Sequence, residues 1–310
     1  MILSVSRRTD VPAFYADWFF ERLRQGFVLV RNPMNPHRIS RILLSPEHVD
    51  CIYFWSKDPS PMVSRLHLLQ DYMTVFQFTL NAYSSDIEPH VPQLNARMET
   101  FCKLSDLLGS KRVIWRYDPI LITEDYTVDF HCRMFEHIAQ QLSGRVQQCV
   151  ISFLDMYPTI QKSAQTHHFR SPTEEERQQL AKNLASAGKQ YGFSVQTCAE
   201  QGDYSAFGIR HGKCIDPALV SRLLDCPVKP GKDPNQRPLC GCMPSVDIGA
   251  YNTCRHGCRY CYANHSTTLL NKNTTGYDIL SPILCGRLCE NDQITDRAMP
   301  SVLEKQTSLF

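Results

Sequence analysis

The sequence lacks any long apolar run. No stretch of its 310 residues approaches the roughly 18 consecutive apolar residues that span a membrane, so we expect no membrane partner. The first residues, MILSVSRRTD, also place two arginines and an aspartate where a secretory signal needs an unbroken apolar segment. Together these absences predict a cytoplasmic protein.

The sequence also lacks blocks of like charge. Its 33 basic and 31 acidic residues give a net charge of +2, and the basic residues are spread along the chain. A large nucleic-acid footprint needs clustered Lys and Arg, so none is indicated. A tRNA or a damaged base as substrate stays open as an alternative.

Cysteine, in contrast, is plentiful. In a reducing compartment the 14 cysteines are not expected to form a disulfide framework, so metal binding is the leading interpretation. It does not extend to all of them. Cys51, Cys102, Cys132 and Cys149 lie singly within apolar segments, where a cysteine acts as a small buried hydrophobe.

Short apolar strands alternate with helices along the chain. The segment ILSVS reads as a strand, and Asp10 and Pro12 then mark the start of a helix that Gly26 closes. Segments 27–33 and 38–44 are predicted to form a hairpin. Further strands are expected over 51–55, 74–80, 112–117, 149–154 and 193–198, and helices over 93–109, 128–144 and 171–192.

This alternation is typical of parallel βαβ units. We therefore predict an α/β fold in which residues 1–310 form a single (β/α) barrel or partial barrel. The helix over 171–192 is expected to begin at Ser171 as its N-cap. Five prolines make 227–244 a loop, which leads into a last strand, SVDIGAY, within a cysteine-rich region that covers 198–262.

Three cysteines stand within eight residues in NTCRHGCRYCYAN (252–264). Cys254, Cys258 and Cys261, here called the triad, can converge on one inorganic centre if the loop curls, and Gly257 permits that curl. A structural zinc site normally takes four protein ligands. Three thiolates on a four-iron cubane instead leave one iron open for a small molecule.

The triad, with Tyr260 directly before its last cysteine, resembles the C-x3-C-x-aromatic-C loop of the radical S-adenosylmethionine superfamily. The resemblance implies a 4Fe-4S cluster whose open iron binds S-adenosylmethionine and cleaves it to a 5'-deoxyadenosyl radical, which then acts on an unknown substrate. It implies an electron donor, such as a flavodoxin or a ferredoxin, and it implies that Tyr260 packs beside the cluster.

In that superfamily the cysteine loop follows the first barrel strand, whereas here it begins at residue 254. A circular permutation reconciles the two, with the cysteine strand last in the sequence and ILSVS its neighbour in space. The whole chain also resembles an uncharacterised bacterial family, a domain of unknown function with the number 1848. The resembling segments are SVSRRTD, FWSKDP, WRYDPI, TCAE, KCID, CGCMPSVDIGAYNTCRHGCRYCYAN and QTSLF.

Four further cysteines form a second candidate set. Cys198, Cys214, Cys240 and Cys242, here called the four-cysteine group, could hold an auxiliary iron-sulfur cluster or a zinc ion. The alternative is that some of them are free thiols.

Polar residues follow each predicted strand, and active sites of βα barrels gather at the carboxyl ends of the strands. Arg7, Arg8 and Asp10 are the candidates for cofactor binding, together with Tyr260. Lys57, Arg116, Asp118 and Glu200 are the candidates for catalysis, and Ser56, Asn81 and Asp155 lie at equivalent places. For any of these, a helix cap or an ion-pair partner is the structural alternative.

Two other functions compete with the radical enzyme. In a zinc-stabilised module that binds nucleic acid or protein, the cysteines serve the fold, and Arg255, His256 and Arg259 contact phosphate. A metal-dependent hydrolase or isomerase barrel is the third function. It is disfavoured because none of the 11 histidines clearly follows a strand, and His167 and His168 lie in a polar stretch.

Overall fold

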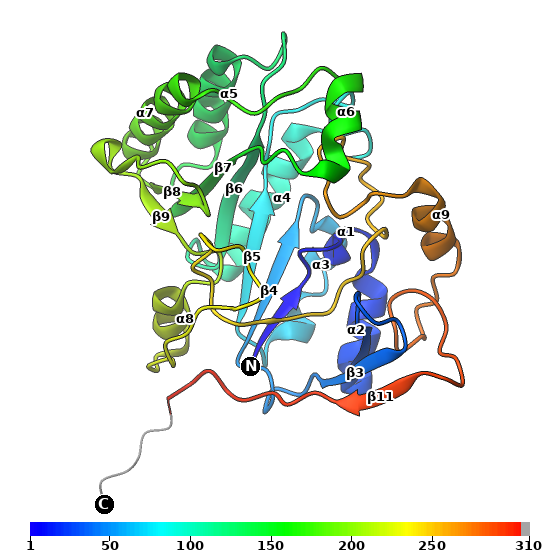
Figure 1. The fold of residues 1–310 in the computed structure, drawn as a ribbon. Helices are drawn as coiled ribbons and strands as arrows, with labels where there is room; N and C mark the ends of the chain where they lie inside the picture. The colour runs from blue at the N-terminus through cyan, green and yellow to red at the C-terminus, as the bar shows by residue number, and fades with distance from the viewer. Residues whose placement is uncertain (305–310) are drawn as a thin grey trace, which may run out of the picture.

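One parallel sheet organises the chain (Figure 1). The computed structural model describes residues 1–304, so the motif QTSLF (306–310) lies outside the described residues. The strands follow one another in space as β10–β1–β4–β5–β6–β7–β8–β9, all parallel. Their bounds are β1 Ile2–Val5, β4 Cys51–Ser56, β5 Thr74–Thr79, β6 Val113–Ile120, β7 Gln148–Phe153, β8 Ser194–Cys198, β9 Arg210–Gly212 and β10 Val246–Asp247.

The predicted α/β class is confirmed, as are the strand positions to within a few residues. In the described chain β9 and β10 end the sheet at its two edges, so a closed barrel is not formed by the pairing seen there. The predicted proximity of the last strand to ILSVS is confirmed, because Leu3 pairs with Val246 and Ser4 with Asp247.

The helices connect successive strands, as right-handed βαβ units require. They are α1 Val11–Phe14, α2 Ala16–Gln25, α3 Ser60–Val63, α4 Leu94–Leu108, α5 Val128–Gln141, α6 Gln161–Thr166, α7 Glu174–Gln190, α8 Pro217–Leu224 and α9 Thr267–Thr275, with short 3-10 turns at Leu66–Leu69, Pro158–Ile160 and Ser205–Phe207. In residues 1–304 no helix is long and apolar enough to cross a membrane. The predicted hairpin forms as β2 Phe27–Arg31 and β3 Arg38–Leu43, and β11 Gln293–Asp296 joins β3 in a separate sheet.

The helix ends follow from local hydrogen bonds. The Asp10 carboxylate accepts from Ala13 N at 3.0 Å, and Gly26 ends α2 in the left-handed region at φ 78°. The prediction that Ser171 caps the third long helix is wrong. Thr173 is the N-cap of α7, because its hydroxyl accepts from Glu176 N while the Glu176 carboxylate accepts from Thr173 N, a reciprocal capping box.

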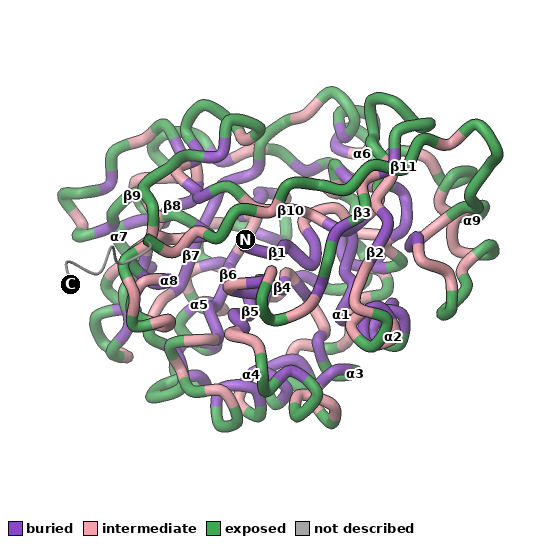
Figure 2. Tube along the Cα trace, turned by 90° about the horizontal axis from the view of Figure 1, so that it is seen from below, coloured by how far each residue is buried: buried purple, intermediate pink, exposed green. Residues whose placement is uncertain are grey.

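The central strands of the sheet are mostly buried (Figure 2). Alternate strand residues such as Leu3, Phe54 and Trp115 enter the larger core with the helices. The opposite face, which includes Tyr53 and Ile114, packs against a second core made by α8 and the loop around 240–243. The proline-rich segment therefore covers the face of the sheet opposite the larger core, here called the inner face.

Candidate functional site

The cysteine loop (252–264) lies at the carboxyl ends of the strands, where it contacts residues that follow β1 and β5. The segment leading into α9, orange in Figure 1, runs past α1 and α6. Its backbone is fixed from several elements: Tyr15 Oη donates to Thr253 O at 2.6 Å, Arg259 N donates to Ile87 O at 2.9 Å, and Ser163 Oγ of α6 donates to Arg259 O at 2.7 Å. The loop is thus built into the protein rather than appended to it.

Gly257 makes the turn between the first two thiols of the triad. Its φ of +69° lies in the left-handed region, and an added Cβ would stand 3.3 Å from the His90 ring. The curl expected at this glycine is therefore confirmed, and a larger residue would meet both backbone strain and a close neighbour.

The three triad cysteines are half-buried and lie on one loop. Burial raises the pKa of Cys254 to about 12, with the charge of Cys261 adding to the effect, and burial likewise raises the pKa of Cys258 and of Cys261. Lys57 opposes that rise at Cys258 and Cys261, because a nearby cation favours the thiolate. Cys258 and Cys261 therefore lie near the same lysine.

Their spacing differs from that of ligands on a single ion. In residues 1–304, no group of three or more His, Cys, Asp or Glu side chains is placed to hold one metal ion. The triad thiols are close enough for their charges to interact, as the mutual effects on their pKa values show.

A buried ion pair lies beside the triad. Lys57 Nζ donates to Glu88 Oε1 at 2.8 Å, and the Tyr260 hydroxyl donates to the same oxygen. The second oxygen, Oε2, is buried with no hydrogen-bond partner among the described residues. Burial alone would raise the pKa of Glu88, but Lys57 and Arg97 hold it below the usual value. Glu88 is therefore a carboxylate with one free acceptor.

Sequence reasoning missed Glu88. It stands in the loop that follows β5, well beyond the strand end at which polar residues were sought. Asn81, which was found at that strand end, donates to Asp118 O at 2.9 Å and accepts from Asp118 N at 2.9 Å. The only sequence signal for Glu88 is an acidic residue next to Pro89 in a loop.

Asp10 is fully engaged inside the protein. Its carboxylate accepts from Ser56 Oγ and from Lys57 N, each at 2.7 Å, and from His256 Nε2 of the cysteine loop at 2.8 Å, besides capping α1. This geometry matches the cap alternative, with the added effect that Asp10 joins the cysteine loop to β4.

The two arginines after β1 contact aromatic rings. Arg7 lies 4.5 Å from the Trp55 ring and donates to Ser245 Oγ, and its Nη2 is buried without a partner in the described chain. Arg8 lies over Tyr251 at 5.3 Å. Asp247, which sequence analysis did not single out, accepts from Ser4 Oγ, Ser6 Oγ and Arg7 N.

The remaining catalytic candidates lie on β6 and after β8. Arg116 pairs with Asp118, whose other oxygen accepts from Ser152. Arg116 Nη1 also donates to Cys214 Sγ at 3.0 Å. Glu200 accepts from Phe153 N at 2.9 Å, and burial raises its pKa to about 7.

The four-cysteine group comes together in the second core. The Sγ atoms of Cys198 and Cys214 lie 3.1 Å apart, and Cys240 and Cys242 belong to the same buried core and affect the pKa of these thiols. Asp155, in contrast, forms a half-exposed pair with Arg237 of the proline-rich loop. The structure thus holds two separate thiol sets.

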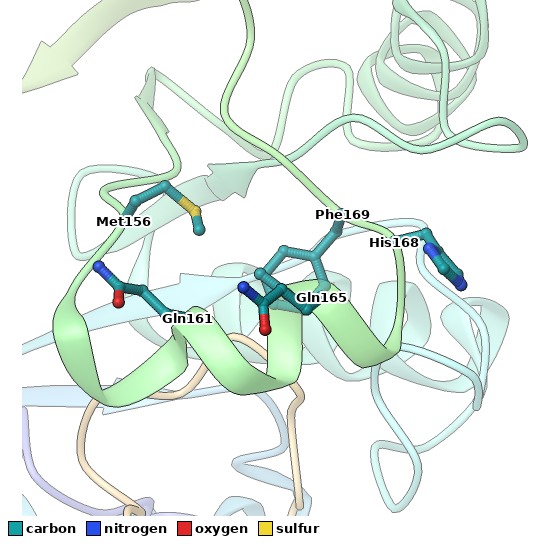
Figure 3. Close-up of a pocket in the computed structure, with 6 residues that line it drawn as sticks. Met156, Gln161, Gln165, His168 and Phe169 are labelled. Atoms are coloured by element: carbon teal, nitrogen blue, oxygen red, sulfur yellow. The ribbon is translucent and has the colours of Figure 1, made fainter.

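A surface pocket of about 430 Å³ lies elsewhere, beside α6. Figure 3 shows Gln161 and Gln165 of α6 and the side chains of Met156, His168 and Phe169 around it. None of the candidate site residues lines this pocket, so its shape carries no argument about the triad.

Comparison with known proteins gave one match. The family model described as a domain of unknown function (DUF1848) matches residues 2–263, a span that holds every candidate site residue from Arg7 to Cys261. No curated protein and no solved structure matches the chain.

Proposed function

We propose that this chain, which belongs to the DUF1848 family, is a radical S-adenosylmethionine enzyme whose cluster is held by the triad. The family's description names no activity, so the proposal depends on the site. The observation that carries it is the set of three half-buried cysteines on one fixed loop, at the carboxyl ends of parallel strands, beside a buried Lys–Glu pair.

The donor set suits a 4Fe-4S cluster. Three thiolates can hold three of its irons and leave the fourth open for S-adenosylmethionine. When bound, such a cluster supplies an electron that cleaves S-adenosylmethionine to a 5'-deoxyadenosyl radical. An external donor such as a flavodoxin or a ferredoxin is needed to reduce it.

The sheet order supports the same proposal. Starting from the β10 edge, the strands run β10, β1, β4 and onward, so the cysteine loop follows the first strand in space although it comes last in the sequence. This is the place that the resemblance to the radical superfamily implies. A circularly permuted partial barrel accounts for it.

The protein's own residues prepare the site. Glu88 Oε2 is a free, buried acceptor, which makes it our candidate for the ammonium group of the cofactor, while Lys57 and Tyr260 fix the other oxygen. On the far side of the loop, Arg255 lies 5.8 Å from the Phe14 ring and His256 packs 4.6 Å from it.

Among the catalytic candidates, Glu200 is the best placed to move a proton. Asp118 has both oxygens engaged, by Arg116 and by Ser152, and Arg116 is held by that pair. Glu200 has only a backbone N–H bonded to Oε1, and its pKa of about 7 allows either protonation state at neutral pH. We therefore propose that the substrate binds near Glu200.

Anaerobic reconstitution of the full chain with iron and sulfide tests the proposal. We expect a brown protein that, once reduced, converts S-adenosylmethionine to 5'-deoxyadenosine. Cys258→Ser should lose the iron and the cleavage, whereas Cys149→Ser, a buried single cysteine of β7, should keep both. The proposal would be refuted if the wild-type protein took up no iron and instead carried a zinc ion that is lost in Cys258→Ser.

A further inference from the structure

We propose that Cys198, Cys214, Cys240 and Cys242 form a tetrathiolate site for one Zn²⁺ ion, separate from the triad. The four thiols come from three segments that are distant in sequence: the end of β8, the residues after β9, and the proline-rich loop. All four are more than nine-tenths buried and belong to the core on the inner face of the sheet.

Sulfur contacts decide the size of the centre. Cys198 and Cys214 Sγ are 3.1 Å apart, and Cys240 and Cys242 lie in the same buried core, near enough to Cys214 for the thiols to affect one another's pKa. A Zn–S bond of about 2.3 Å places two thiolates of a tetrahedral site about 3.8 Å apart. The four thiols do not surround an ion position in this arrangement, and at the Cys198–Cys214 pair zinc binding requires the two sulfurs to move apart by less than about 1 Å.

Charge supports an ion held by four thiolates. A tetrathiolate zinc site carries a net charge of about −2. Two arginines face the four-cysteine group: Arg116 donates to Cys214 Sγ at 3.0 Å, and Arg7, near Cys214 and Cys240, has a buried Nη2 without a partner in the described residues. Arg116 also pairs with Asp118. A negatively charged zinc site nearby would account for the buried, unpaired Nη2 of Arg7.

The backbone around the group is held from several sides. Gln77 Nε2 donates to Cys214 O at 2.8 Å, Met243 N donates to Ile215 O at 3.1 Å, and Asp233 N donates to Cys242 O at 2.9 Å. The loop is otherwise short of regular structure, since its prolines remove backbone donors. A zinc ion would fasten this loop to the inner face of the sheet, which is the usual role of a closed four-ligand site.

Metal analysis of the full chain, purified anaerobically from zinc-containing medium, tests the inference. We expect about one zinc per chain that resists brief chelation, and a loss of at least about tenfold in Cys214→Ser and in Cys242→Ser. Cys258→Ser should keep its zinc, as should the control Cys149→Ser. Replacement by Co²⁺ should give the intense visible bands of a tetrahedral thiolate site, absent from Cys214→Ser.

Three results would overturn the inference. One is a wild-type protein without zinc under these conditions. Another is iron that falls in Cys214→Ser as it does in Cys258→Ser, which would indicate an iron-sulfur cluster instead. The third is zinc that leaves with Cys258→Ser, which would contradict the proposed function as well. If Cys214→Ser fails to fold, the wild-type protein is stripped of metal by a chelator in mild denaturant, and zinc is then added back. Recovery of a site at which Co²⁺ can replace the zinc would support the inference, and no recovery would contradict it.

Discussion

Replacing Lys57 by Met tests the buried ion pair beside the triad. Lys57 Nζ and Glu88 Oε1 are 2.8 Å apart, and the Glu88 side chain is 1% exposed. Removing one partner of a buried pair costs about 3–5 kcal/mol, because the other charge stays buried without compensation. Tyr260 and Asn81 still donate to Glu88, so we expect the lower end, about 3 kcal/mol.

Urea denaturation of the full chain at pH 7, followed by circular dichroism, measures this cost. Lys57→Met/Glu88→Gln should recover most of the lost stability, since no charge is then left buried. Lys103→Met, an exposed lysine of α4, is the matched control and should change the free energy of unfolding by less than about 0.5 kcal/mol. A single-variant cost below about 1 kcal/mol, or a double variant weaker than Lys57→Met, would show that the pair does not act as the structure indicates.

Three further predictions concern the loop, the acid and a helix cap. Gly257→Ala should cost about 1–2 kcal/mol and lower iron uptake, because alanine is strained at φ +69° and meets His90; equal iron in Gly257→Ala and wild type would contradict this. Burial favours the protonated form of Glu200 in the folded state, so ionisation of Glu200 destabilises the fold increasingly from about pH 4.5 to its folded pKa of about 7. Glu200→Gln should therefore gain up to about 3 kcal/mol of stability over wild type as the pH rises through that window, as urea titrations at several pH values would show. A difference between the two proteins that does not change with pH would refute the shift. Thr173→Ala should lose about 1 kcal/mol by removing the α7 cap, whereas Ser171→Ala should lose less, as thermal melts would show, and the reverse order would contradict the capping box.

The elements that sequence reasoning located are those with local causes. The strands β4 to β8 are short, apolar and bounded by polar residues, so their positions followed from composition. The cap of α7 was misplaced by two residues because Ser171, Pro172 and Thr173 offer overlapping signals. Only the reciprocal bonds between Thr173 and Glu176 separate them.

The two thiol sets differ in how much sequence could reveal. The triad is contiguous, so its spacing is visible in the chain itself. The four-cysteine group depends on the parallel pairing of β8 with β9 and on the proline-rich loop folding back over the sheet. Nothing in a one-dimensional pattern gives the 3.1 Å approach of Cys198 to Cys214, and Glu88 was missed for the same reason.

The strand β10 lies beside β1, as predicted, although it is only two residues long. Two residues form only a brief ladder with β1, yet Asp247 accepts from Ser4 Oγ at 2.8 Å, Ser6 Oγ at 2.6 Å and Arg7 N at 2.8 Å. A Cβ on Gly249 would stand 2.0 Å from Ser6 Oγ, so this close approach requires glycine. Side-chain hydrogen bonds to one carboxylate therefore replace strand length as the cause of docking, and they fix the start of the cysteine loop against the residues that follow β1.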